Sequence, residues 1–175
     1  MAIQTIGVIG AGTMGNGIAQ VCALAGINVV MVDISTEAVE RGVKTVSGSL
    51  DRLVKKEKIS AADKDAALAR IRATTAYADL TGAELVIEAA TENEGLKLRI
   101  LKEIVAIVAP TGIIASNTSS LSITEIGAAT KRPERVSAVV SRGGRPDLAG
   151  NALPAVQAPT LLIVGGYDDV VIQLN

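Results

Sequence analysis

The sequence contains no Phe, no Trp and no His, and it has only two Tyr residues and one Cys. The shortage of aromatic side chains disfavours a nucleic-acid surface on which bases stack. The absence of histidine excludes any chemistry of this chain that requires an imidazole. The single thiol, Cys22, cannot form a disulfide within the chain, which fits a reducing cytoplasm. Its sequence neighbours include no cation, so we expect a buried, unreactive thiol.

The chain also lacks an excess of charge of either sign, because 17 basic and 18 acidic residues leave a formal net charge of −1. Such a chain has no overall field to attract nucleic acid or an anionic membrane. Residues 2–32 carry no charge, but glycines and amide side chains interrupt this segment. A membrane span needs about 20 predominantly apolar residues, and a signal peptide begins with a basic stretch. We therefore expect a buried strand, a glycine turn and a packed helix here.

Aliphatic residues supply most of the hydrophobic side chains, which make up 49% of the chain. Runs typical of strands alternate with segments of helical spacing. The expected strands are residues 3–9, 28–32, 71–74, 84–88 and 112–115, and the expected helices include residues 13–25 and about 92–109. This alternation predicts an α/β fold, a Rossmann-like doubly wound parallel sheet in three layers with right-handed crossovers.

Residues 34–70 are more than a minimal crossover needs, and they predict a helical pair that projects from the body between the second and third strands. Ser35 and Thr36 suit the start of the first helix, and Ser60 with Asp63 forms a capping-box pattern for the second. Lys55, Lys56 and Lys58 lie near the predicted junction. A solvated face is the favoured interpretation of these lysines, and a phosphate-binding face is the alternative.

A glycine-rich turn of the form G-x-G-x-x-G occupies residues 10–15, after the first expected strand and before the first expected helix. In such a turn the first glycine allows a sharp bend and the second lets backbone N–H groups approach a pyrophosphate. The third allows close packing of helix and strand, with the phosphates at the helix N-terminus. The candidate cofactor-binding residues of this turn are Gly10, Gly12, Thr13, Met14 and Gly15.

Asp33 ends the second expected strand, at the spacing where an acidic residue binds adenosine ribose hydroxyls. A carboxylate there repels a 2′-phosphate, so the pattern favours NAD over NADP. The alternative is a purely structural glycine turn followed by a helix-capping Asp.

Polar residues follow the fourth and fifth expected strands, where the ligand crevice of such a sheet opens. Residues 91–94 form a capping-box pattern with Thr91 as N-cap. Glu92 and Lys97 are expected in the first turns of the helix that follows. The polar run of residues 116–120 could hold a nicotinamide or a substrate oxygen, although loops are ordinarily rich in Ser and Thr.

Taken together, these motifs resemble the NAD-binding domain of the L-3-hydroxyacyl-CoA dehydrogenases of the bacterial 3-hydroxybutyryl-CoA type. The resemblance covers residues 1–136 and rests on residues 6–15, 32–33, 87–93, 115–124 and 132–136. It implies that Asp33 binds the adenosine ribose of NAD, and that Glu92 and Lys97 lie along the cofactor. It implies that Asn117 and Ser119 flank the nicotinamide, with Ser119 bonding the substrate oxygen. The helical pair would be the family's coenzyme A-contacting element.

The resemblance ends before the family's catalytic histidine, whose register falls at Val140 in this chain. The family's partner glutamate and helical C-terminal domain are also not found. Residues 138–147 and 158–168 instead resemble an α/β-hydrolase of the dienelactone-hydrolase type, with Asp168 at the place of the triad acid. The hydrolase nucleophile motif and histidine are absent, so no Ser–His relay can form.

We therefore interpret the chain as a chimera that forms one domain of 175 residues. Residues 1–136 would be its dinucleotide-binding portion, and residues 137–175 a strand–helix–strand segment that completes the sheet. Residues 161–164 would form an apolar edge that invites pairing into a homodimer.

Three hypotheses about function remain at this stage. The first is a catalytically silent NAD-binding domain, in which Ser119 is a vestigial contact to the substrate oxygen. The second is a weak residual 3-hydroxyacyl-CoA dehydrogenase, and the third is a structural chimera that binds no ligand. No metal, membrane or nucleic-acid partner is expected, and hydrolase activity has the least support.

Overall fold

The computed structural model describes residues 3–117, together with the backbone of residues 139–142 and 160–163. Its larger part is a parallel sheet of five strands in the order β3-β2-β1-β4-β5. The strands are β1 (Thr5–Ile9), β2 (Asn28–Val32), β3 (Ile71–Thr74), β4 (Leu85–Glu88) and β5 (Ile113–Ser116). The helices are α1 (Thr13–Leu24), α2 (Thr36–Lys55), α3 (Ala61–Ala69), the 3₁₀ helix η1 (Tyr77–Leu80) and α4 (Glu94–Ile107). The predicted Rossmann-like doubly wound fold is confirmed.

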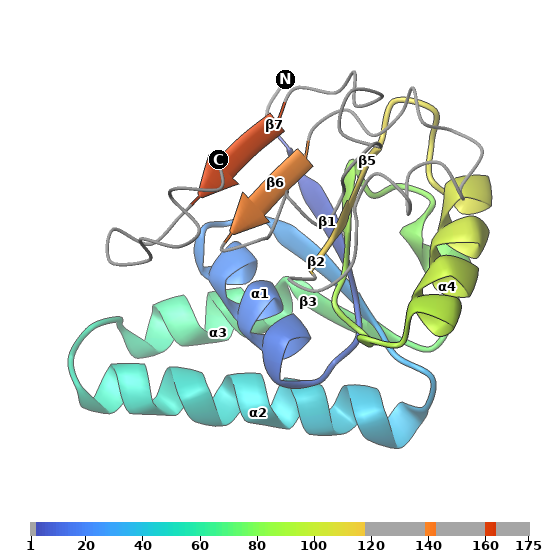
Figure 1. The fold of residues 1–175 in the computed structure, drawn as a ribbon. Helices are drawn as coiled ribbons and strands as arrows, with labels where there is room; N and C mark the ends of the chain where they lie inside the picture. The colour runs from blue at the N-terminus through green and yellow to red at the C-terminus, as the bar shows by residue number, and fades with distance from the viewer. Residues whose placement is uncertain (1–2, 118–138, 143–159, 164–175) are drawn as a thin grey trace.

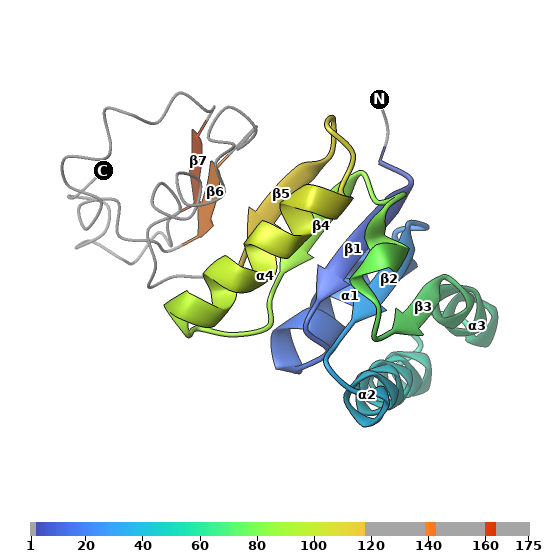
Figure 2. The same cartoon turned by 90° about the vertical axis from the view of Figure 1, so that its right-hand side faces the viewer.

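The sheet is covered on both faces, which explains why its strands are almost uniformly apolar. Figure 1 shows α1, α2 and α3 on one side of the sheet and α4 on the other, and Figure 2 gives the same arrangement from a second direction. Side chains alternate between the faces along β1. Ile6 and Val8 join the core under α1, α2 and α3, whereas Ile9 joins the core under α4 and η1.

Both helices of the pair between β2 and β3 begin where the sequence predicts. The Ser35 hydroxyl accepts the Ala38 N–H (3.2 Å) at the start of α2. Ser60 and Asp63 form both hydrogen bonds of a capping box at the start of α3. Val39, Val46 and Leu50 anchor α2 in the core.

Strands β6 (Val139–Arg142) and β7 (Thr160–Ile163) form a parallel pair with each other. The sequence places them on the edge of the main sheet, but no ladder between the described strands joins either one to β5. The division into residues 1–136 and 137–175, with the second segment completing the sheet, stays a prediction. Within the described ranges, no helix combines the length and the apolar character that crossing a bilayer requires.

Candidate functional site

The glycine turn sits at the carboxyl end of β1 and gives each of its three glycines a different role. Gly10 has a φ of 98°, in the left-handed region that favours glycine, and its N–H donates to the Val32 carbonyl (2.8 Å). A Cβ on Gly15 would lie 1.6 Å from the Gly10 carbonyl oxygen, so only glycine lets α1 pack this closely on the turn. A Cβ on Gly12 would meet nothing within 4 Å, which leaves that side of the turn open.

The N-terminus of α1 has the features of an anion-binding site. Gly12 is the N-cap, no side chain caps the helix, and its first turn contains no acidic residue. Thr13 and Met14, the first two helical residues, are exposed. The partial positive charge of the helix end and its N–H groups therefore face open space rather than a side chain of the chain itself.

Asp33 follows β2 and lies against the same turn. One of its carboxylate oxygens accepts the Ala11 N–H and the other accepts the Ile34 N–H, both at 2.7 Å. Each carboxylate oxygen has two lone pairs, so both can still accept a hydroxyl proton from a ligand. Ile34 beside it is 91% exposed, which places a large apolar side chain at the rim of the turn.

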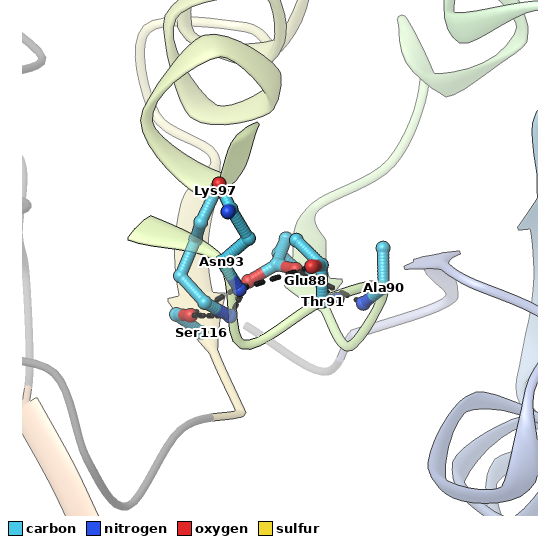
Figure 3. Close-up of polar contacts among 6 residues, drawn as sticks. All are labelled: Glu88, Ala90, Thr91, Asn93, Lys97 and Ser116. Atoms are coloured by element: carbon cyan, nitrogen blue, oxygen red, sulfur yellow. Dashed lines mark hydrogen bonds and ion pairs between the residues drawn. The ribbon is translucent and has the colours of Figure 1, made fainter. Parts of the chain in front are cut away.

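A buried ionic network lies on the other side of β1, at the carboxyl ends of β4 and β5 (Figure 3). The Glu88 carboxylate and the Lys97 ammonium form an ion pair, with side-chain exposures of 0% and 1%. The Ser116 hydroxyl lies 2.8 Å from the same Glu88 oxygen and 3.2 Å from Lys97 Nζ. The second Glu88 oxygen accepts the N–H groups of Ala90 (2.9 Å) and Thr91 (3.4 Å).

The start of α4 corrects the predicted capping box at residues 91–94. The N-cap is Asn93, whose side-chain oxygen accepts the Leu96 N–H (2.9 Å). Thr91 instead accepts the Asn93 N–H with its hydroxyl (3.0 Å), so it closes a turn before the helix. Glu92 therefore lies in the loop before α4 and is exposed, not in the helix as predicted.

The other predicted site residues do not form one group in the structure. Lys97 is directed at Glu88 and Ser116, not into open space. Asn117 follows β5 directly, and its N–H donates to the Glu88 carbonyl (2.7 Å). Ser119 and Asp168 lie outside the described residues. The structure thus gathers the glycine turn with Asp33, and separately Lys97 with the edge of β4 and β5.

Glu88 and Ser116 belong to the site although their own roles did not emerge from the sequence. Glu88 ends an apolar strand and has the same alternation phase as Val86, whose side chain joins the core under α4. An acid in that phase must be buried beneath the helix, and a buried acid requires a partner. Lys97, in the helix that covers this strand, was therefore the feature of the sequence from which the buried ion pair could have been predicted.

Tyr77, in η1, is half-buried. Burial raises the pKa of its phenol, and the negative charges of Glu103, Asp33 and Glu88 raise that pKa further. The hydroxyl therefore stays protonated at neutral pH and can donate a hydrogen bond. Among the residues that the structure describes, no group of three or more Cys, Asp or Glu side chains is arranged to hold a metal ion.

Comparison with known proteins identifies the family. The model of the "3-hydroxyacyl-CoA dehydrogenase, NAD binding domain" family matches residues 5–140. The chain belongs to this family. NAD is the cofactor of this 3-hydroxyacyl-CoA dehydrogenase domain, and the match extends past residue 136, where the sequence resemblance was placed.

Individual relatives agree with the family match. The chain is 49% identical over 133 residues to a 3-hydroxybutyryl-CoA dehydrogenase of Bradyrhizobium diazoefficiens, covering 76% of this chain and 45% of the relative. A 3-hydroxybutyryl-CoA dehydrogenase of Mycobacterium tuberculosis is 42% identical over 136 residues, covering 77% and 48%. The solved (S)-3-hydroxybutyryl-CoA dehydrogenase of Ralstonia eutropha has a TM-score of 0.77 and 47% identity, covering 94% of this chain and 65% of that one. The chain therefore spans about half the length of these curated relatives.

Proposed function

We propose that this chain binds NAD at the glycine turn and does not itself catalyse hydride transfer. The uncapped N-terminus of α1 carries the proposal, because its first turn offers N–H groups and no competing acid. The pyrophosphate of NAD would lie against Gly10, Gly12 and the first turn of α1. The open space at Gly12 supports this placement, since a ligand backbone can approach there closely.

Asp33 would hold the adenosine ribose and select NAD over NADP. Its carboxylate already contacts the turn through Ala11, so a ribose hydroxyl bound to it would sit beside the pyrophosphate site. A 2′-phosphate would meet this negative charge and be repelled. We propose that Glu92, Lys97 and Asn117 form the nicotinamide side of the site, because all three lie around the carboxyl ends of β4 and β5. Lys97 is buried and would contribute through its ion pair with Glu88.

Loss of catalysis is inferred from the residues available to the chain. NAD, when bound, supplies a hydride acceptor, but removing the hydroxyl proton of a 3-hydroxyacyl thioester requires a base. The chain has no histidine, and Val140 stands at the register of the family's base. The amine of Lys97 is paired with Glu88 and is therefore not free to act as that base. General base catalysis contributes about 10²–10⁴-fold, so its loss alone removes most of the rate.

Calorimetry with NAD and NADP tests the binding proposal directly. We expect saturable heat with NAD, and at least tenfold weaker binding of NADP. The matched variant Gly12→Ala should lose NAD binding while its melting temperature stays near that of the parent, because its Cβ meets no protein atom within 4 Å. Absence of binding heat at millimolar NAD would favour a structural domain without a ligand.

A rate measurement separates the silent domain from a weak dehydrogenase. NADH absorbance is followed with a 3-ketoacyl-CoA substrate for the parent and for Ser119→Ala. We expect no turnover above background in either protein. Turnover that disappears in Ser119→Ala would instead establish a residual dehydrogenase with Ser119 on the substrate oxygen.

Residues 137–175 are proposed to derive from an α/β-hydrolase-like source and to join the same folding unit. The family match ends at residue 140, and the curated relatives cover 76–77% of the chain, so the proposed origin of the last residues rests on their sequence resemblance alone. One cooperative thermal transition, shared by amides of both segments in hydrogen exchange, is expected. Two separate transitions would contradict a single domain.

The remaining expectations are proposals about partners and location. Exposed Lys55, Lys56 and Lys58 near the end of α2 are available to a coenzyme A thioester. We also propose that the apolar residues 161–164 pair two copies of the chain into a homodimer. Partial burial raises the pKa of the Cys22 thiol, which disfavours the reactive thiolate. We also propose that the chain lies in the cytoplasm.

A further inference from the structure

We propose that Glu88, held by Lys97 and Ser116, is a positioning residue that fixes the loop of residues 89–91 against the glycine turn and thereby sets the affinity for NAD. This inference rests on the proposed function, because it concerns the same binding site. It adds a role for three residues whose side chains face one another beneath the start of α4, two of them fully buried (Figure 3).

The loop of residues 89–91 is the wall against which the glycine turn packs. A Cβ on Gly10 would lie 2.7 Å from the Ala89 carbonyl oxygen and 2.7 Å from the Ala90 Cα. The Ala89 N–H also donates to the Ile9 carbonyl (2.8 Å), immediately before the turn. A shift of this loop toward β1 would therefore displace Gly10, and a shift away would remove its support.

Glu88 fixes the shape of this loop through one carboxylate oxygen. That oxygen accepts the N–H groups of Ala90 and Thr91, two consecutive donors that make no other hydrogen bond among the described residues as the chain leaves β4. Hydrogen bonds to an ionised acceptor are roughly twice as strong as neutral ones. The loop is thus fastened at two successive residues by a single side chain.

Lys97 and Ser116 keep this carboxylate in place. A fully buried carboxylate is costly unless it is paired and hydrogen-bonded. Lys97 supplies the opposite charge from α4, and Ser116 supplies a hydroxyl from β5, both at the oxygen that does not hold the loop. One Glu88 oxygen therefore contacts the loop, and the other contacts α4 and β5.

Two double variants separate holding the loop from burying a charge. Glu88→Gln/Lys97→Met keeps an amide oxygen for the Ala90 and Thr91 N–H groups and an amide NH₂ for Ser116. Glu88→Met/Lys97→Met has nearly the same volume but no acceptor for the loop. Both remove the ion pair and any direct contact of Lys97 with NAD, so these effects cancel in the comparison. We expect the Met/Met variant to bind NAD at least tenfold more weakly than the Gln/Met variant.

Amide hydrogen exchange gives a second readout that needs no cofactor. The Ala90 and Thr91 amides should exchange at least tenfold faster in the Met/Met variant than in the Gln/Met variant. In the parent protein both amides should be protected relative to an unstructured chain. Unprotected amides in the parent would overturn the inference without any variant, even if the Met/Met variant failed to fold.

The possible results distinguish failure of the positioning role of Glu88 from failure of the proposed NAD binding. Equal NAD affinity in the two folded double variants, with the parent binding NAD, overturns the positioning role and leaves the proposed function intact. A parent that binds no NAD overturns the proposed function and, with it, the claim that the loop sets affinity.

Discussion

Strands β2 and β4 flank β1 on either side, and a carboxylate follows or ends each of them beside the glycine turn. Asp33 is partly exposed and contacts only backbone N–H groups among the hydrogen bonds described for it. Glu88 is fully buried and paired with Lys97. Both hold backbone near the turn, but only Asp33 remains accessible to a ligand. The same chemical group is thus partly exposed on one side of β1, where we propose that NAD binds, and part of a buried ion pair on the other.

The alternation of side chains explains this difference. Glu88 has the phase of Val86 and faces the core beneath α4, where helix α4 covers it. Asp33 has the phase of Met31 and lies on the side of α1, whose first turn is open. One residue of displacement along either strand would exchange the two environments.

Replacing Lys97 by Met should give the largest effect in this comparison, because it leaves Glu88 buried without a counter-charge. We expect a loss of about 3–5 kcal/mol in the free energy of unfolding, measured in urea. The matched control is Lys64→Met, which breaks the more exposed Lys64–Asp51 pair (2.6 Å). That control should cost less than about 1 kcal/mol. Equal losses in the two variants would contradict a special status for the buried pair.

The next largest effect is expected from Gly10→Ala, which presses the turn against the Glu88 side. The new Cβ would lie 2.7 Å from backbone atoms of Ala89 and Ala90, at a φ of 98°. The strain and overlap should cost about 2–4 kcal/mol of unfolding free energy. Gly12→Ala, on the open side, should change stability by less than about 1 kcal/mol. A stable Gly10→Ala protein would show that the loop yields easily.

Asp33→Asn should affect NAD binding strongly and the free energy of unfolding only slightly. The amide can still accept one of the two backbone N–H groups, so we expect a loss of only about 1–2 kcal/mol in unfolding free energy. NAD affinity should fall at least tenfold, and the preference over NADP should shrink because the repelling charge is gone. Calorimetry with both dinucleotides checks this. An unchanged preference would mean that another residue selects the cofactor.

The sequence alone predicts the structure on the Asp33 side of β1. The run of residues 28–32 predicts β2 with the bounds that the structure has, and the capping box of Ser60 and Asp63 is formed. These features depend on contacts between residues close in the chain, which local patterns encode. The packing of Gly15 against Gly10 also follows from the spacing of the glycine motif.

The buried contacts on the Glu88 side of β1 could not be predicted from local patterns. The ion pair of Glu88 and Lys97 depends on how α4 lies over β4, and Ser116 joins it from a third element. The start of α4 was misplaced for a related reason, because Asn93 competes with Thr91 as the N-cap and the preceding loop decides between them. Local patterns rank such alternatives poorly when tertiary contacts favour one of them.

The smallest expected effect concerns Glu84, which precedes β4 at the opposite end from Glu88. It accepts the N–H groups of Gln4 (2.5 Å) and Thr5 (3.0 Å), and these hydrogen bonds hold the pKa of its carboxyl below the ordinary value. The unfolded chain therefore binds this proton at a higher pH, about 4.3, than the folded protein does. The contribution of Glu84 is complete above that pH and is lost as pH falls through the lower pKa of the folded state.

Glu84→Gln should accordingly flatten the acid side of the stability profile without changing NAD affinity. Urea unfolding between about pH 5 and pH 3 measures the slope for parent and variant, and only the parent includes the Glu84 contribution. Asp63→Asn on α3 is the matched comparison, because it removes a second carboxyl whose pKa is lowered in the folded protein, there by hydrogen bonds with Ser60. If Glu84→Gln weakened NAD binding as Asp33→Asn does, the amino end of β4 would be coupled to the crevice. The comparison would then involve the whole strand and not its carboxyl end alone.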